Sequence, residues 1–408
     1  MNTFPPKAWF QYPKLLKKFT NDLVFAELAT LRPTSTKIIN IDISDDVAFG
    51  DLGLGMDSLE LMAVSTSLSR SIHINESHLA DNFLDKRLLK HWQSIVLESL
   101  KIFSERISFK TSGSTGFKKY CTHDLEILEE EAQFIAGLMT GRQRILCAVP
   151  SHHIYGFIFS ILLPRHLSPV VESIDVRGLS PNALSSMMIP GDLVLGFPEF
   201  WKCIEEAGVE FSEDIIGVNS TGPCPEHVGI SLLNRGLCVF YEVYGASETA
   251  GIGWRQHPSD AYSLFPFWEK QSLGSQLQRV SHNGQLFTVD LQDRVQWVSK
   301  NSFTIHGRKD DIVQIGGVNV SLHYVRDVLK KHPGIKNASV RMMNPDEGNR
   351  LKAFIVLNDN TDEFKTLASL KAHINNVLLP HEIPKSIKIG SSLVTNNLGK
   401  LVDWSIDV

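Results

Sequence analysis

The sequence predicts an α/β protein of several domains, and three patterns along the chain support this. Apolar residues recur at helical spacing within residues 1–100. Short β-rich runs alternate with helical stretches in residues 101–307, as in layered α/β folds. Residues 308–408 show a compact α+β pattern of their own. A chain of 408 residues has room for two or three such domains.

The first hundred residues predict a small helical bundle. Residues 13–31 and residues 88–100 both carry apolar positions at helical spacing. The stretch DSLELMAVSTSLSRSI at 57–72 places four apolar residues on one helical face: Leu61, Val64, Leu68 and Ile72.

The middle of the chain predicts a core of strands and helices. Its β-rich runs include RISFKTSG, RILCAVP, DLVLGF and LCVFYEVYG, and a long helical stretch, HDLEILEEEAQFIAGLM, separates the first two. Beyond Arg308, the stretches DDIVQIGGVNVSLHYVRDVLKK, LKAFIVLN and LASLKAHINNVLL predict a smaller α+β domain. The polar junction HGRKDD at 306–311 suits a hinge between the two.

Composition excludes several classes of protein. A net charge of −5 gives no broad cationic field, so we expect no nucleic-acid partner. The opening residues do not resemble a secretory leader, and the longest apolar stretch, at 154–163, is too short to cross a bilayer. No pair of cysteines has CxxC spacing, which argues against a zinc site or a disulfide framework; they are Cys121, Cys147, Cys203, Cys224 and Cys238. We therefore expect a reduced, cytoplasmic protein.

The stretch TSGSTGFKK at 111–119 predicts a loop that binds phosphate. It is not a Walker loop, because counting from Gly113 places Lys118 where the second glycine of that motif belongs. Glycines allow the backbone to approach a polyphosphate, while hydroxyls and N–H groups donate to its oxygens and Lys119 supplies positive charge. The alternative is a polar hairpin turn.

This loop resembles the signature loop of the adenylate-forming superfamily, which includes acyl-CoA synthetases, adenylation domains of peptide synthetases and luciferases. Further stretches are similar to the same family in the same order: PSHHIYGF at 150–157, STGPCP at 220–225, YGASE at 244–248, HGRKDD at 306–311 and NNLGK at 396–400. The resemblance implies an enzyme that joins a carboxylate to AMP with release of pyrophosphate, and then passes the acyl group to a thiol.

The resemblance assigns the charged groups of the reaction. Lys400 would bridge the carboxylate and the α-phosphate, and Glu248 would hold Mg²⁺, a cation that prefers oxygen ligands. A solvated lysine and an acid at a helix start are the plain alternatives. The triphosphate would lie on residues of the loop, namely Thr111, Ser112, Gly113, Ser114, Thr115, Gly116 and Lys119.

The resemblance also assigns the adenine and acyl sites. Tyr244 would stack on adenine, Ser247 would bond phosphate, and Gly222 would let adenine lie against the backbone. His153 and Gly156 would edge the acyl pocket. A core aromatic and a structural histidine are the alternatives.

Residues near the predicted hinge complete the implied site. Asp293 and Arg308 would bind the ribose hydroxyls, with Asp290 as a rival for Asp293. Asp310 would be the hinge on which the C-terminal domain turns between half-reactions, and Gly317 would leave room for a pantetheine arm. A surface salt bridge is the alternative for Arg308 and Asp310.

Three features depart from the family pattern. Lys118 stands where proline is usual, and Ser247 stands where threonine is usual. The phosphate loop begins at residue 111, whereas typical members carry a longer N-terminal subdomain before it.

The stretch LGMDSLELM at 54–62 resembles the acyl-carrier signature LGxDSL. Ser58 is therefore a candidate for phosphopantetheine attachment. Asp57 and Glu60 also form a D-x-x-E pair that could simply cap a helix. The bundle could instead replace the missing subdomain structurally.

Together these observations predict an ATP-dependent acid–thiol ligase that uses ATP, Mg²⁺ and a pantetheine thiol. The thiol would belong to CoA or to a carrier protein, including a group on Ser58, and the acid would be an aryl acid or a fatty acid. A non-catalytic module that binds adenylate or docks a carrier is the alternative. A phosphotransferase of the acetate-kinase kind would release ADP, and the sequence lacks a matching nucleotide motif.

Overall fold

The computed structural model describes residues 7–32, 44–79, 82–110, 119–271, 276–280, 284, 286–308, 312–344, 347–359, 361–394 and 403–406. The chain divides into two compact units. The first contains residues 1–111, 120–290 and 297–304, and the second contains residues 112–119, 291–296 and 305–408. No described helix combines the length and the apolar character needed to span a membrane.

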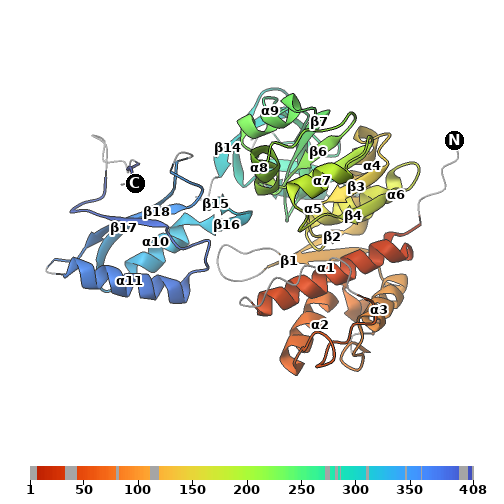
Figure 1. Ribbon diagram of the computed structural model, residues 1–408, viewed down its shortest axis with the longest axis horizontal. Coiled ribbons are helices and arrows are strands. Elements are labelled where there is room, and N and C mark those ends of the chain that lie inside the picture. The colour runs from red at the N-terminus through yellow and green to blue at the C-terminus, as the bar shows by residue number, and fades with distance from the viewer. Residues whose placement is uncertain are drawn as a thin grey trace. The chain divides into compact units, whose positions relative to one another are not determined.

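Three helices form the N-terminal part of the first unit and lie side by side (Figure 1). They are α1 (Pro13–Leu31), α2 (Ser58–Ile72) and α3 (Leu89–Ile102), accompanied by the short turns η1 (Trp9–Gln11) and η2 (Ile74–Ser77). Pro13 occupies the first position of α1, where its missing N–H costs nothing. The four residues predicted to share one face of α2 are all buried, which confirms that prediction.

A mixed sheet of nine strands among the described residues has the order β13-β14-β9-β8-β7-β6-β5-β3-β4, and its strands from β9 to β4 in this order lie in the first unit. Its parallel part is β4 (Glu172–Asp175), β3 (Arg144–Cys147), β5 (Asp192–Gly196), β6 (Ile216–Asn219) and β7 (Val239–Ala246). The remaining strands are β8 (Ala250–Arg255) and β9 (Tyr262–Leu264), which run antiparallel, then β14 (Ser302–Arg308) and β13 (Asp293–Trp297). Every residue of β5 and β6 is buried, as expected for parallel strands covered on both faces.

Helices and smaller strands surround this sheet. The helical elements are α4 (Leu125–Leu138), α5 (Ile154–Phe157), η4 (Ile158–Leu162), α6 (Leu163–His166), α7 (Pro181–Met187), α8 (Pro198–Glu206) and α9 (Glu226–Asn234). The antiparallel pair β1 (Arg106–Lys110) and β2 (Tyr120–Asp124) is separate, as is the ladder β10 (Glu269–Lys270), β11 (Gln276–Val280) and β12 (Leu286–Asp290). The predicted α/β class is confirmed.

The predicted boundary at residue 100 does not separate two units of the structure, because residues 1–111 belong to the same unit as the sheet. Aromatic packing is one reason. Trp9 and Phe19 lie edge-on against Phe157, with ring centroids 5.3 and 5.4 Å away. Burial of such rings is a large contribution to stability, so the bundle and the sheet share a core.

The second unit has its own apolar core. From residue 312 onward this unit contains the hairpin of β15 (Ile312–Ile315) and β16 (Val318–Ser321), followed by α10 (Leu322–Lys330). A three-stranded sheet follows, formed by β17 (Ile335–Met342), β18 (Leu351–Leu357) and β19 (Ser386–Ile389). Helix α11 (Glu363–Val377) lies between β18 and β19 in the chain. Gly316 and Gly317 form the hairpin turn with φ of 57° and 76°. Such a turn favours glycine at both positions.

Candidate active site

Several predicted site residues lie outside the described residues. They are Thr111, Ser112, Gly113, Ser114, Thr115, Gly116, Asp310 and Lys400. The strands that flank the loop are described: β1 ends at Lys110, β2 begins at Tyr120, and these two residues are paired in the antiparallel ladder. The sequence predicted a strand before the loop and a helix after it, but not β2.

The YGASE stretch ends β7 and enters the turn that leads to β8. Tyr244 lies near the end of β7, where the ladder with β8 shifts register, and Glu248 lies exposed in the turn. The alternative that Glu248 begins a helix is therefore wrong. A strand break beside a loop is a common way to aim side chains out of a sheet.

A buried histidine joins this turn to β2. The Nε2 atom of His123 lies 2.7 Å from the Ser247 carbonyl oxygen. Burial lowers the pKa of His123, so the ring is neutral at pH 7 and donates Nε2–H to that carbonyl. Because His123 follows the predicted phosphate loop by only four residues, the bond brings the strand that leaves this loop against the residue predicted to bond phosphate.

The STGPCP loop is fixed to β7, the strand that carries Tyr244. Ser220 Oγ donates to the Val243 carbonyl at 2.8 Å, and the side chain of Asn219 donates to the Gly222 carbonyl at 2.9 Å. Thr221 adopts a φ of 73°, so the chain turns sharply here. The structure thus brings the predicted adenine loop next to Tyr244 through β7.

Glu242 holds this arrangement together, although the sequence analysis missed it. The buried carboxylate accepts from the Cys224 N–H at 3.1 Å and from the Asn219 amide at 3.2 Å. Arg255 of β8 pairs with it. Only the folded sheet brings these groups together, so nothing in the local sequence indicated the role.

Tyr244 belongs to an aromatic cluster. Its ring centroid lies 5.9 Å from that of Tyr262 and 5.7 Å from that of Phe303. Tyr262 and Phe303 are themselves stacked at 5.8 Å. Tyr244 is half-buried, so packing orients its ring without removing it from solvent.

The predicted acyl segment follows β3. His153 occupies the N-cap position of α5 without a capping hydrogen bond from its side chain, and its ring centroid lies 4.3 Å from that of His152. Loss of water lowers the pKa of the half-buried His152, and the neighbouring His153 lowers it further. The pKa of His153, which is exposed, is lowered as well. Both are therefore neutral at pH 7.

Gly156 is explained by packing. A side-chain Cβ at this position would lie 2.1 Å from the Pro150 carbonyl oxygen, closer than any real contact. Gly156 therefore allows α5 to pack on its own preceding loop. The place of Gly156 at the edge of the acyl pocket stays a prediction.

The remaining predicted residues lie elsewhere in the fold. Asp290 ends β12 in the first unit, and its carboxylate accepts from Gln276 at 3.0 Å. Asp293 begins β13, Arg308 ends β14 and Gly317 lies in the β15–β16 turn, all in residues of the second unit. Among the described residues, no atom beyond its chain neighbours lies within 4 Å of a Cβ built on Gly317, so its backbone conformation explains the glycine.

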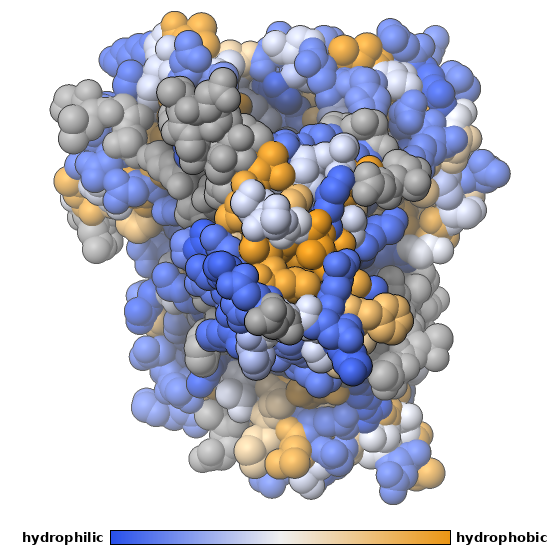
Figure 2. Space-filling view, turned by 90° about the vertical axis from the view of Figure 1, so that its left-hand side faces the viewer, coloured by the Kyte–Doolittle hydropathy of each residue, from blue (hydrophilic) through white to orange (hydrophobic). Residues whose placement is uncertain are grey.

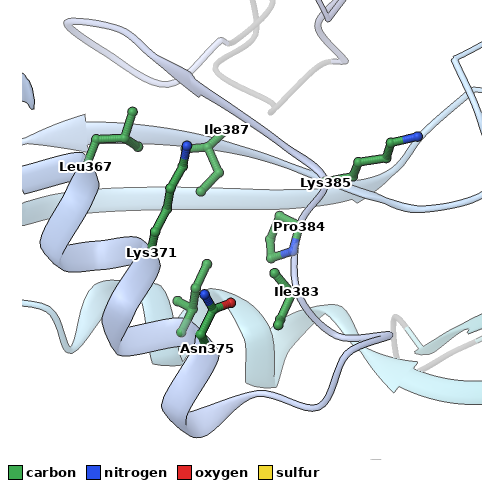
Figure 3. A pocket seen from close by; sticks show the side chains of 8 residues that line it. Leu367, Lys371, Asn375, Ile383, Pro384, Lys385 and Ile387 are labelled. Carbon is green, nitrogen blue, oxygen red and sulfur yellow. The ribbon is translucent and has the colours of Figure 1, made fainter.

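A pocket in the second unit contains none of the predicted site residues. It measures about 210 Å³ and lies between α11 and β19, lined by Leu367, Lys371, Ile374, Asn375, Ile383, Pro384, Lys385 and Ile387 (Figure 3). Figure 2 shows the side on which α10 and α11 lie, with apolar residues gathered among hydrophilic ones. No carboxylate or histidine lines the pocket, so it lacks the groups that adenylation needs.

Glu131 is a buried acid that contacts β8 just after the YGASE turn. It lies on α4, and its Oε2 accepts from the Gly251 N–H at 2.9 Å. Burial raises the pKa of Glu131 to about 7. The native state therefore keeps a proton that the unfolded state releases between pH 4.5 and 7, and this group makes stability fall as pH rises through that window.

We expect the Glu131→Gln variant to lose this pH dependence. At pH 8 its free energy of unfolding should exceed that of the parent by on the order of 2 kcal/mol, because the amide stays neutral. Urea unfolding of both proteins at pH 5 and pH 8 measures the difference. If the free energy of unfolding changed by the same amount between pH 5 and pH 8 in both proteins, the raised pKa of Glu131 would be contradicted.

Comparison with known proteins identifies the family. Residues 325–400 match the AMP-binding enzyme C-terminal domain. The chain is 32% identical over 366 residues to a 4-coumarate–CoA ligase of Cereibacter sphaeroides, which covers 88% of this chain and 86% of that protein. A 4-coumarate–CoA ligase of Halorhodospira halophila is 33% identical, with 85% and 87% covered. The chain belongs to the adenylate-forming superfamily. It is an enzyme of the acyl-CoA ligase type.

Solved structures of this superfamily share the fold. An o-succinylbenzoate CoA synthetase from Bacillus subtilis superposes with a TM-score of 0.60 at 14% identity, covering 95% of this chain and 91% of that one. An amide bond synthetase from Marinactinospora thermotolerans gives a TM-score of 0.58 at 15% identity, with 94% and 92% covered.

The comparisons also bear on the N-terminal bundle of this adenylate-forming enzyme. Only 12% of the chain lies outside the match to the Cereibacter relative, so part of residues 1–100 must lie within it. At least part of the short segment before the phosphate loop is thus shared with this ligase. The carrier-like nature of the bundle is not confirmed by these relatives.

Proposed function

We propose that this enzyme adenylates an aryl carboxylic acid with ATP, releases pyrophosphate and transfers the acyl group to a pantetheine thiol. The bond from His123 to Ser247 carries the proposal, because it joins the strand leaving the predicted phosphate loop to the predicted phosphate-binding turn. The 4-coumarate–CoA ligases among its relatives favour an aryl acid over a fatty acid.

The described residues fit ATP and Mg²⁺. A half-buried ring at Tyr244 beside the exposed loop at Thr221 suits a flat base, and the exposed Glu248 carboxylate is a hard-oxygen ligand. Bound Mg²⁺ would neutralise charge on the phosphates. Ser247 would donate its hydroxyl to a phosphate oxygen while His123 holds its carbonyl.

The first half-reaction forms a bond between a carboxylate oxygen and the α-phosphorus and breaks the bond to pyrophosphate. Both reactants are anions, so positive charge must gather where they meet. We assign this to Lys400, with Lys119 and the hydroxyls of residues 111–115 on the leaving phosphates. Asp293 and Arg308 are proposed to hold the ribose.

In the second half-reaction the thiol attacks the acyl carbon and AMP leaves. Asp310 is proposed as the hinge between the two poses, and Gly317 as the place where the pantetheine arm passes. CoA ligases among the relatives support CoA as acceptor. The five free cysteines suit the reducing cytoplasm, where we place the enzyme.

Ser58 keeps a carrier acceptor open. It is the first residue of α2 and is exposed, with Leu59 and Met62 exposed beside it. Asp57 and Glu60 also form a complete capping box, with N···O distances of 2.8 and 3.1 Å. The exposed serine supports attachment of phosphopantetheine, whereas the capping box explains the same residues without it.

An acid panel tests the function. We expect pyrophosphate and AMP to form with 4-coumarate or a related aryl acid, and a thioester to form with CoA. No acid-dependent pyrophosphate would favour the non-catalytic alternative. In parallel, the protein and its Ser58→Ala variant are incubated with CoA and a pantetheinyl transferase; a mass gain in the parent alone would establish the carrier, and no gain would retire it.

A further inference from the structure

A buried ionic network joins α1 to the sheet. Asp22 of α1 is 2% exposed, and its Oδ2 accepts from the N–H and the hydroxyl of Ser151, at 2.7 and 2.6 Å. Its Oδ1 accepts from Arg177, which also pairs with Asp175. Lys18 lies 3.9 Å from Asp175. Two acids and two bases therefore balance, so removing one charge leaves another unpaired in a poorly solvated place.

The position of Ser151 gives this network a role beyond attachment. Ser151 is fully buried and lies between β3 and His153, the cap of α5. Both hydrogen bonds that Ser151 donates to Asp22 therefore fix the chain immediately before the two histidines. The negative charge of Asp22 also acts on His153, where it opposes the lowering of that pKa.

The helix has other attachments. The Lys14 ammonium pairs with Glu172 at 2.6 Å, and the Glu27 carboxylate pairs with Lys110 at 2.6 Å. Trp9 and Phe19 pack against Phe157. Loss of the Asp22 bonds would thus leave α1 in place while releasing Ser151.

We propose that Asp22 is a positioning residue for the acid substrate. It acts through Ser151 to set the backbone at His152 and His153, and so the edge of the acyl pocket. This inference rests on the proposed function, since it requires that the acid bind beside His153. Small displacements of groups that orient a substrate can cost large factors in rate.

The Asp22→Asn variant tests the inference, because the amide is nearly the same size but lacks the charge. We expect the KM for the aryl acid to rise roughly tenfold, with the KM for ATP unchanged within a factor of about two. The Ser151→Ala variant loses one of the two bonds and should raise the KM for the acid by a smaller factor. It also serves if the Asp22 variant fails to fold.

The matched control is Lys14→Gln, which breaks an exposed ion pair between the same helix and the same part of the chain. Neither KM should change in it. An unchanged KM for the acid in both test variants, with the parent active, would overturn the inference while leaving the proposed function standing. A parent without acid-dependent pyrophosphate release would instead defeat the proposed function.

Discussion

Replacing Lys400 with alanine is expected to lower the rate of adenylate formation by about two to three orders of magnitude. The ammonium is needed mainly when negative charge of the carboxylate meets that of the α-phosphate, so its loss should reduce kcat more than it raises either KM. Acid-dependent exchange of pyrophosphate into ATP measures the step without the thiol.

The control for this change is Lys365→Ala, which removes an exposed lysine on α11 of the second unit. Its exchange rate should equal that of the parent. The unfolding midpoint should be nearly the same in all three proteins, because Lys365 makes only an exposed ion pair with Asp362 at 3.9 Å and the role proposed for Lys400 is in catalysis. Parental turnover in the Lys400 variant would refute the role.

We expect the Lys352→Met variant to show a large loss of stability in the second unit. Lys352 is fully buried in β18, and its ammonium contacts Glu347 at 2.6 Å, Asp403 at 3.1 Å and the Trp404 carbonyl at 2.7 Å. These bonds, with the packing of Trp404 on Phe354, hold residues 403–406 against the sheet. Removing the ammonium leaves two carboxylates without their buried partner, which is strongly destabilising.

We expect the unfolding midpoint of this unit to fall by roughly 10 °C at pH 7. The pKa of Glu347 is lowered chiefly by its bond from Lys352. Burial acts to raise the pKa of Asp403, but bonds from Lys352 and Asn344 outweigh it, so that pKa is lowered too. A carboxylate whose pKa is lower in the folded protein than in the unfolded chain stabilises the fold at pH values above its ordinary pKa. This stabilisation is lost as the pH falls through the pKa of the folded state. The difference in unfolding midpoint between the variant and the parent should therefore be smaller at acid pH.

Thermal unfolding at pH 7 and pH 3, together with hydrogen exchange in β18, tests this expectation. Lys385→Met, at the rim of the exposed pocket, is the control. A midpoint unchanged at pH 7 would show that the buried ammonium adds nothing to the anchoring of the chain end.

Local pattern was enough to predict parts of this fold. The buried face of α2 follows from helical spacing alone, and the capping pair of Asp57 and Glu60 is visible three residues apart.

Contacts between distant residues were not predictable. Asp22 and Ser151 are 129 positions apart, His123 and Ser247 are 124 apart, and Glu131 and Gly251 are 120 apart. Each pair is brought together by packing of separate elements, which no local spacing encodes. For the same reason the sequence separated residues 1–100 from the core, although their aromatic side chains complete it.

The central claim is that a carboxylate oxygen attacks the α-phosphorus of ATP. An acid carrying ¹⁸O in both carboxylate oxygens tests it most directly, with the phosphate products analysed by mass spectrometry after turnover with CoA. The account predicts one ¹⁸O atom in AMP and unlabelled pyrophosphate. Label in inorganic phosphate, with ADP as the nucleotide product, would contradict it.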